Sequence, residues 1–318
     1  MRFIRTVTGD CAPWELGHCQ CHEHLFIEKG KSFDINPALW MDDEEASTAE
    51  ALLYKYAGGG ALVDAQPAGA GSMPEALRRV SKRTQVKIIA STGFHKRVFY
   101  PENHWLFTLD ERALIERFAA DVALGIAVDA EGGTRRCGVK AGVVKCALDE
   151  TGLCGASMRL FRAAAGAAVQ TGAPILVHTE DGAHAVELTR FMADLGVPAH
   201  RLILCHVERS LWPTEQKLEV ARTGAYLECD TIARVHCHSD ADGARFLKLL
   251  CDEGYEDSIL LGLDTTRRRM KSYGAQTGLD YILSDYLPLL RKTGLSDLQI
   301  HKFCVENPAR ALAFSNAD

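Results

Sequence analysis

Three kinds of sequence feature are absent, and each absence narrows the function. No apolar stretch approaches the ~20 residues that a helix needs to cross a bilayer, and no secretory signal peptide is recognisable. We therefore expect a cytoplasmic protein with no membrane partner. The formal net charge is −6 without a long basic tract, which argues against nucleic acid as a partner. Neither GxGxxG after the first strand-like segment nor a phosphate-binding GxxxxGK(S/T) occurs, so nucleotide cofactors have no support.

The composition that remains is typical of one globular enzyme domain. The 318 residues suffice for a single β/α barrel, which takes ~250 residues plus insertions, so we expect one domain over 1–318. Hydrophobic residues make up 47% of the chain, enough for a sizeable core. The eleven cysteines are scattered, mostly within apolar runs, so we expect reduced, buried thiols rather than disulfides.

Strand-like and helix-like segments alternate along the chain. Amphipathic or Ala-rich helices are expected at 109–125 and 155–172. The expected strands are 18–24, 61–66, 87–94, 141–147, 174–180, 201–208, 225–231 and 258–265. Such alternation implies parallel pairing, and eight repeats fit closure into a (β/α)8 barrel. An open, doubly wound sheet is the alternative, but it would not bring residues from so many strands to one point.

Five of the apolar segments end in a residue that can bind a metal or be converted to one that does. They read CHEHL, GVVKC, ILVHTE, ILCHVE and LLGLDT, and carry His22, His24, Lys145, His178, His206 and Asp264. The C-terminal strand ends are where a barrel carries its chemistry. His22 and His24 are two residues apart, so on an extended strand they share one face, and Cys19 and Cys21 should point the other way. Two histidines on one strand, taken alone, more often have a structural role. The further histidines and the aspartate at equivalent strand ends make metal binding the favoured interpretation.

The ligand types indicate a divalent metal site. Imidazole and carboxylate suit zinc, and also manganese, iron, cobalt or nickel. Four histidines, an aspartate and a bridging group are too many for one tetrahedral ion, so two ions sharing a nucleophilic water or hydroxide are the simpler interpretation. Lys145 fits beside two cations only if it is neutral or converted to a carbamate.

These residues resemble the phosphotriesterase family of the amidohydrolase superfamily, from about Gly9 to the closing VENPARALAF. The resemblance implies a distorted (β/α)8 barrel with a binuclear metal centre, in which Lys145 is N6-carboxylysine and bridges two ions, zinc being the expected metal. It also implies that Asp264 takes the proton from the attacking water and passes it to the leaving group. Because members of that family are often dimers, a homodimer is an expectation, although the sequence itself shows no interface.

Four segments resemble the lactonases of this family that open phosphorylated sugar lactones. They are VDAQPAGAG (63–71), IIASTGFHK (88–96), FYPENHW (99–105) and LGLDTTRRRMKSYG (261–274). In that subgroup a Lys after strand 7 and Arg residues past the strand 8 Asp hold the phosphate of a small-molecule substrate. The corresponding basic residues here are Arg267, Arg268 and Arg269, with His236 at the position expected for the Lys. Lys96 and Tyr100, after strand 3, are further candidates for substrate binding.

Three carboxylates near the expected ligands have open roles. Glu23 should face away from the two histidines and form a structural pair. Glu180 and Glu208 each follow a ligand His by two residues, so they are either hydrogen-bonding partners of the ligands or solvated rim residues. For the whole protein, the sequence favours lactone hydrolysis; the alternatives are a phosphotriesterase, whose neutral substrates have no use for an Arg cluster, and a metal-binding protein without catalysis.

Overall fold

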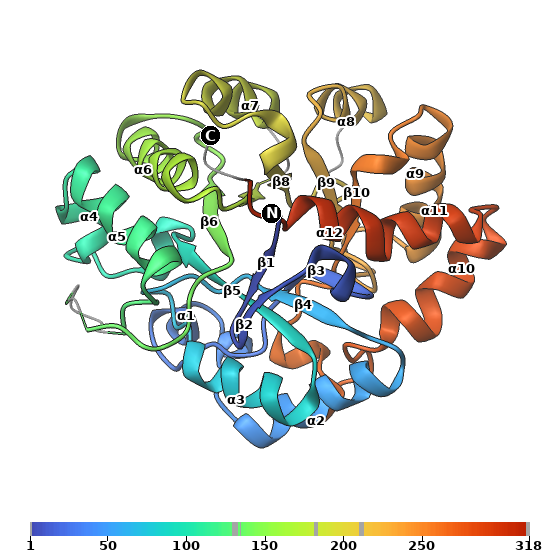
Figure 1. Ribbon diagram of the computed structural model, residues 1–318. Coiled ribbons are helices and arrows are strands. Elements are labelled where there is room, and N and C mark those ends of the chain that lie inside the picture. The colour runs from blue at the N-terminus through green and yellow to red at the C-terminus, as the bar shows by residue number, and fades with distance from the viewer. Residues whose placement is uncertain (1, 129–132, 134, 181–183, 210–212, 316–318) are drawn as a thin grey trace.

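Eight parallel strands form the centre of the molecule, and helices surround them (Figure 1). The computed structural model describes residues 2–128, 133, 135–180, 184–209 and 213–315. The sheet order is β10-β9-β8-β7-β6-β5-β4-β3. The strands are β3 (Cys19–Glu23), β4 (Ala61–Asp64), β5 (Lys87–Gly93), β6 (Val143–Leu148), β7 (Ile175–Thr179), β8 (Leu202–Leu204), β9 (Tyr226–Cys229) and β10 (Ile259–Leu261). Between β10 and β3, the Asp264 N–H donates to the His22 carbonyl oxygen at 2.9 Å. The expected distorted (β/α)8 barrel is therefore confirmed.

All eight expected strands are present, but several end earlier than the sequence pattern indicates. The expected strand 201–208 stops at Leu204, and the expected strand 258–265 stops at Leu261. Shortly beyond these ends His206 and Asp264 adopt left-handed backbone conformations, with φ of +64° and +49°. An apolar run followed by polar residues cannot reveal such a turn, because the turn depends on tertiary contacts.

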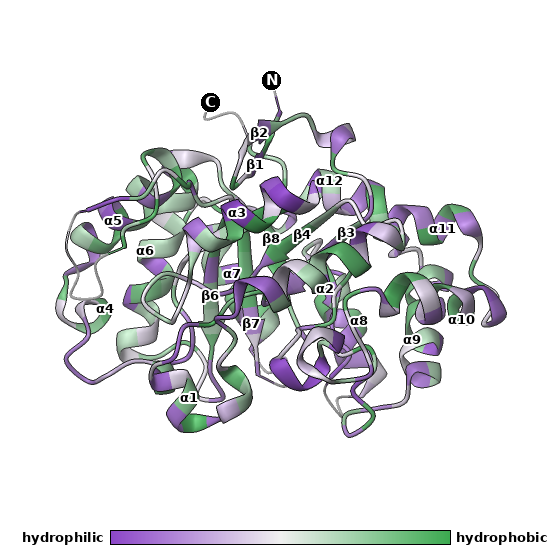
Figure 2. Cartoon of the chain, turned by 90° about the horizontal axis from the view of Figure 1, so that it is seen from below, coloured by the Kyte–Doolittle hydropathy of each residue, from purple (hydrophilic) through white to green (hydrophobic). Residues whose placement is uncertain are grey.

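Helices connect the strands and cover the outside of the barrel. The longer ones are α2 (Glu44–Tyr56), α3 (Pro74–Thr84), α5 (Glu111–Ala123), α6 (Gly155–Thr171), α7 (Ala185–Asp194), α8 (Thr214–Ala221) and α9 (Asp240–Asp252). The shorter ones are α1 (Lys31–Ile35), α4 (Trp105–Thr108), α10 (Leu287–Lys292), α11 (Asp297–His301) and α12 (Asn307–Ala311). The helices expected at 109–125 and 155–172 correspond to α5 and α6. Figure 2 shows hydrophilic and hydrophobic residues alternating along these outer helices, as expected for amphipathic helices that cover a core.

Helix α5 illustrates how the local sequence produces these elements. The side chain of Asp110 caps its first turn by accepting a hydrogen bond from the Ala113 N–H at 2.8 Å. Leu114, Phe118 and Val122 then recur every four residues and are fully buried. This stripe packs against the barrel, whereas the opposite face of the helix stays in contact with solvent.

The barrel interior holds its own buried cluster, separate from the layer between strands and helices. Cys19 and Cys21 belong to this interior cluster together with Val63. The expectation that the two thiols face away from the histidines is therefore wrong. The reason is a register irregularity between Gln20 and Glu23, where β3 pairs with β4. A bulge of this kind interrupts the strict alternation of side chains, so thiols and histidines of one strand can share the barrel interior.

A short antiparallel hairpin that the sequence pattern did not indicate crosses one end of the barrel. It consists of β1 (Ile4–Thr6) and β2 (Gly9–Cys11), and the Val7 N–H anchors it to the Ile88 carbonyl oxygen at 2.8 Å. Figure 2 shows this hairpin on the side of the molecule opposite α1. Since α1 follows the C-terminal end of β3, the end of the barrel that carries the site is the one away from the hairpin.

Two composition-based expectations can be compared with the structure. All eleven cysteines are unpaired, and most are buried, although Cys154 is exposed. In the described part of the chain, no helix combines the length and apolar character needed to cross a membrane.

Candidate metal centre

The six expected metal ligands converge at the C-terminal end of the barrel. His22 and His24 come from β3, Lys145 from β6 and His178 from β7, while His206 and Asp264 follow β8 and β10. Three contacts link them, two between neighbouring strands and one, between His22 and Lys145, across the barrel. His22 Nε2 lies 3.4 Å from Lys145 Nζ, His24 Nε2 lies 3.3 Å from Asp264 Oδ1, and His178 Nδ1 lies 2.8 Å from His206 Nε2.

Two of these six residues hold a strained backbone. His206 and Asp264 are non-glycine residues with φ of +64° and +49°. Left-handed conformations in such residues cost of order 1 kcal/mol or more and concentrate at functional sites. Here the strain turns both side chains toward the other ligands directly after their strands end.

The surroundings of the Lys145 amine offer little stabilisation to a positive charge. Its side chain has 0% exposure. Its Nζ contacts only His22 Nε2 at 3.4 Å and Cys205 Sγ at 4.0 Å, and no carboxylate among the described residues lies within ion-pair distance. A buried, unpaired charge is very costly. The site therefore fits a neutral or carboxylated lysine with cations beside it, and the residues present fit a divalent metal centre.

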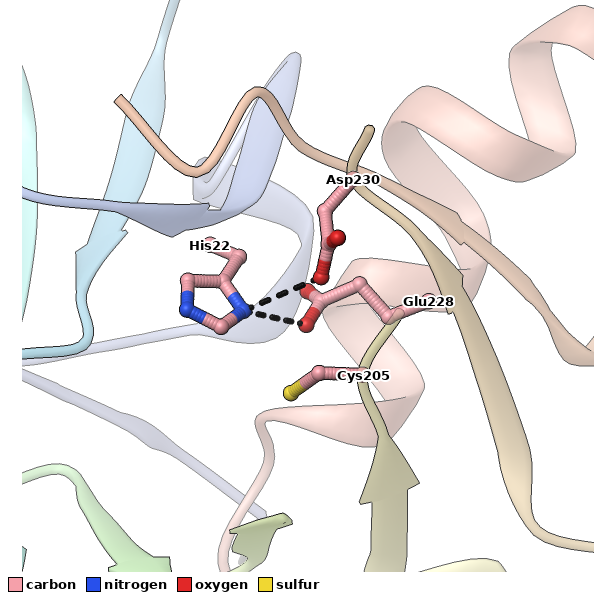
Figure 3. A group of neighbouring side chains, drawn as sticks. All are labelled: His22, Cys205, Glu228 and Asp230. Atoms are coloured by element: carbon pink, nitrogen blue, oxygen red, sulfur yellow. Dashed lines mark hydrogen bonds and ion pairs between the residues drawn. The ribbon is translucent and has the colours of Figure 1, made fainter. Parts of the chain in front are cut away.

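Carboxylates hold the far side of the His22 ring (Figure 3). His22 Nδ1 lies 3.0 Å from Glu228 Oε2 and 3.1 Å from Asp230 Oδ2, all three side chains being buried. Because ionised carboxylates only accept hydrogen bonds, Nδ1 carries the proton, and Nε2 is free to bind a metal. Potential ligand atoms of His22, Cys205, Glu228 and Asp230 lie within 4.8 Å of one another. The hydrogen-bond pattern assigns this group to the support of His22.

Carboxylates also accept hydrogen bonds from the rings of His206 and His178. His206 Nδ1 donates to Asp230 Oδ1 at 2.6 Å, so Asp230 supports both His22 and His206. His178 Nε2 donates to Glu180 Oε2 at 2.9 Å, which leaves Nδ1 facing His206 Nε2. Burial lowers the pKa of His178 to about 4, so this ring is neutral and can act as a ligand.

Glu180 also pairs with Lys96 through its other oxygen. Hydrogen bonding to His178, and then to Lys96, lowers the pKa of the Glu180 carboxyl. Of the two roles left open for Glu180, the hydrogen-bonding partner is the one that the structure supports. Glu208 is buried as well and accepts from both the N–H and the hydroxyl of Thr231 at 2.5 Å, so it is no solvated rim residue. Glu23 accepts from the Leu263 N–H at 2.8 Å, consistent with a structural role.

Two arginines that sequence reasoning missed hold Asp264. Arg209 and Arg234 donate to Asp264 Oδ2 at 2.9 and 2.8 Å, so Oδ1 is left to face His24. Burial alone would raise the pKa of the Asp264 carboxyl, but Arg234, with His24, holds it well below its usual range. Arg234 stands two residues before His236 in the same loop, and Arg209 stands three after His206. Their position next to expected site residues was the only signal in the sequence.

A cavity of about 240 Å³ lies over the expected ligands. Its lining includes His22, His24, His178 and Asp264, together with Gln66, His95, Lys96, Phe99, Arg234 and Thr266. Of the residues expected to bind substrate, Lys96 is therefore at the cavity. Tyr100 is buried and does not line this cavity; its hydroxyl accepts a hydrogen bond from the His95 N–H at 2.8 Å.

The remaining residues expected to bind substrate lie outside that lining. His236 is exposed. Arg269 is buried, and its guanidinium donates to the carbonyl oxygens of Leu263 and Ile232. Arg268 is exposed, and the Arg267 guanidinium lies over the Trp40 and Tyr273 rings, 5.5 and 5.2 Å from their centroids. The contribution of this triplet to substrate binding stays a prediction.

The chain is similar over its whole length to known hydrolases. Residues 2–312 match the Phosphotriesterase family. A phospho-furanose lactonase of Mycoplasmopsis synoviae is 29% identical, the alignment covering 98% of this chain and 92% of the relative. An N-acetyltaurine hydrolase of Danio rerio is 28% identical, with 98% of both chains covered. The crystal structure of a lactonase from Listeria monocytogenes superimposes with a TM-score of 0.90 at 29% identity, covering 99% of this chain and 100% of that chain.

These similarities agree with the geometry of the site. The family depends on a binuclear metal centre, and the described residues hold potential ligand groups at the corresponding end of the barrel. The named relatives are hydrolases, and lactonases are among them in both sequence and structure. The chain therefore belongs to the phosphotriesterase family, within its lactonase-like subgroup, and is a metal-dependent hydrolase.

Proposed function

We propose that this enzyme opens the ring of an anionic lactone, with a phosphorylated sugar lactone as the preferred substrate. The observation that carries the proposal is the position of Arg234. Its guanidinium reaches the cavity that the expected ligands line, and it already holds a carboxylate there. A neutral triester would gain nothing from a cation at this place, whereas a phosphate would gain charge-assisted hydrogen bonds. The names of the lactonase relatives support the same substrate class.

The chain's own residues would divide the work as follows. When bound, two divalent ions, with zinc as the expected metal, would polarise the ester carbonyl and lower the pKa of the attacking water. His22, His24 and Asp264 would hold one ion and His178 and His206 the other, with Lys145 as a carbamate between them. Asp264 would accept the proton of the attacking water and pass it to the ring oxygen that leaves. Arg209 and Arg234 would fix the orientation of that carboxylate.

A second candidate is hydrolysis of an amide that carries an anionic group. The N-acetyltaurine hydrolase relatives, similar over 98% of this chain, favour it. Metal-assisted attack on a carbonyl carbon serves both an ester and an amide, and both substrates would present an anion to Arg234.

The experiment is a comparison of substrates on one preparation of the metal-loaded enzyme. The panel contains a 5-phosphorylated pentono-1,4-lactone, the same lactone without phosphate, N-acetyltaurine and a neutral organophosphate triester. We expect the largest kcat/KM for the phosphorylated lactone. A preference for the triester or for the unphosphorylated lactone would contradict the proposal, and a preference for N-acetyltaurine would favour the second candidate.

A further inference from the structure

One histidine at the metal cavity has no role among the expected ligands. His95 follows β5, and its ring lies beside His178, with 5.5 Å between the ring centroids. It lines the cavity that holds His22, His24 and Asp264. Its position depends on Gly93, where φ is +96° and an added Cβ would collide with the Lys145 carbonyl oxygen. That close approach lets the Phe94 N–H donate to the same oxygen at 2.9 Å and brings the next residue over the site.

The backbone fixes which nitrogen of His95 carries the proton. Nδ1 accepts a hydrogen bond from the Lys96 N–H at 2.7 Å, so in the neutral ring the proton is on Nε2. Nε2 is on the opposite edge of the ring, away from the backbone. No group among the described residues accepts a hydrogen bond from Nε2. This atom is also absent from the set of fully buried polar atoms that lack a hydrogen-bond partner.

The ring is also held firmly in place. Phe99 packs against it edge to face, with 4.6 Å between centroids. The His95 N–H donates to the Tyr100 hydroxyl at 2.8 Å, which ties the turn to the following residues. His95 therefore presents a rigid N–H donor to the cavity before any substrate binds, and such preorganised donors stabilise developing charge without reorganisation.

We propose that His95 is a catalytic residue whose Nε2–H donates a hydrogen bond to the substrate carbonyl oxygen as negative charge develops on it. This inference rests on the proposed function, because it requires attack on a carbonyl carbon. The proton stays on Nε2 throughout, and no bond to His95 forms or breaks. The hydrogen bond strengthens as the carbonyl oxygen becomes negative, so its loss should lower kcat more than it changes KM.

The chain offers a control in His104, which is on the segment that follows and is buried, whereas His95 is partly exposed. His104 Nδ1 accepts from the Leu106 N–H at 3.3 Å, so its ring is held in the same way. It lines the neighbouring cavity with Gly69 and Trp105 rather than the metal cavity. The experiment compares His95→Phe, His95→Gln and His104→Phe with the wild type. Each is assayed on phosphorylated and unphosphorylated pentono-1,4-lactone, with zinc content and thermal unfolding measured on the same samples.

For His95→Phe we expect a loss in kcat of about 100-fold, the size found when one such donor is removed. KM, zinc content and unfolding temperature should stay close to the wild type. His95→Gln keeps an N–H donor and should recover much of the lost kcat, while His104→Phe should keep wild-type kcat.

Three results would overturn the inference. They are a His95→Phe enzyme with wild-type kcat, a loss of zinc that matches the loss of activity, and a Gln variant no better than the Phe variant. A wild-type protein that opens neither lactone would overturn this inference and the proposed function together. If the wild type opens the lactones and His95→Phe has the same kcat, this inference is overturned but the proposed function is not.

Discussion

The buried Lys145 amine lacks a carboxylate partner among the described residues. The side chain has 0% exposure, and among the described residues the hydrogen-bonding contacts of its amine are with the His22 imidazole and the Cys205 thiol. Glu228 and Asp230, two nearby carboxylates, do not pair with this amine, because they accept hydrogen bonds from His22 Nδ1 on the other side of the ring. A carbamate on Nζ would turn this isolated amine into a ligand for two cations, which would then neutralise it.

At this scale we predict that Lys145→Ala loses its metal. Without the bridging group the two ions lose a shared ligand, so metal content per chain, measured by plasma mass spectrometry, should fall to a small fraction of the wild-type value. Lys140→Ala is the control, because Lys140 is exposed and only five residues away. A Lys145→Ala protein with unchanged metal content would show that the lysine does not bridge the ions.

The loops after the strands determine what the site can recognise. The loop after β9 places Arg234 at the cavity, and Ala233 beside it has a left-handed backbone with φ of +58°. The loop after β10 carries the arginine triplet, in which Arg269 is engaged by backbone carbonyls and Arg267 lies over aromatic rings. Recognition of a substrate anion should therefore depend more on the loop after β9.

The corresponding prediction compares Arg234→Ala with Arg267→Ala. We expect Arg234→Ala to lower the ratio of kcat/KM for a phosphorylated over an unphosphorylated lactone by roughly 10- to 100-fold, the loss typical of a hydrogen bond to a charged group. Arg267→Ala should change this ratio much less. The ratio cancels general damage to Asp264, since both substrates need it. If Arg267→Ala has the larger effect, the anion is read by the loop after β10, as the sequence pattern indicated.

A contact between helix α2 and His18, the residue before strand β3, is sensitive to pH. His18 Nδ1 lies 2.8 Å from the Tyr54 hydroxyl. Burial lowers the pKa of His18 to about 4, below the ~6.5 of an unfolded chain. The neutral ring therefore contributes its full stability above about pH 6.5, and that contribution is lost as the pH falls toward 4.

We accordingly expect His18→Gln to lower the free energy of unfolding more at about pH 7.5 than at about pH 5. Urea unfolding of wild type and variant at both pH values measures this difference. Because the variant shares every other titrating group, including the metal ligands, those contributions cancel. An equal effect at both pH values would mean that His18 titrates in the fold as it does in the unfolded chain.

The sequence predicted the strands and the expected metal ligands better than it predicted the conformations of the loops. The eight strands and the six expected ligands follow from short apolar runs with a polar residue at the C-terminal end, which is a local pattern. The bulge in β3 that turns Cys21 into the barrel is set by pairing with β4, so the alternation rule failed there. The approach of Arg209 and Arg234 to Asp264 depends on loop conformations that no periodicity encodes. The same holds for the burial of Arg269.

On the scale of the whole molecule, the expected metal ligands are spread around the barrel. They come from five of the eight strands or the residues directly after them, including β3 and β10, where the sheet joins its own edge. Ions that bind only the folded state stabilise it by mass action, by about 2.7 kcal/mol at a hundred times the dissociation constant. Metal binding should therefore contribute to the stability of the fold as a whole.

Removing the metal should lower the unfolding temperature by roughly 5–10 °C, given the few degrees per kcal/mol typical of domains somewhat smaller than this one. Calorimetry before and after chelation measures the shift, and adding zinc with bicarbonate should reverse it. A chelated protein that unfolds at the original temperature would indicate that the ligands are held together by their hydrogen bonds alone.

The central claim is a binuclear centre built from His22, His24, Lys145, His178, His206 and Asp264. The most direct test is the number of divalent ions per chain in protein prepared with zinc and bicarbonate, determined by plasma mass spectrometry against amino-acid analysis. The account predicts two ions per chain. One ion or none under these conditions would contradict it.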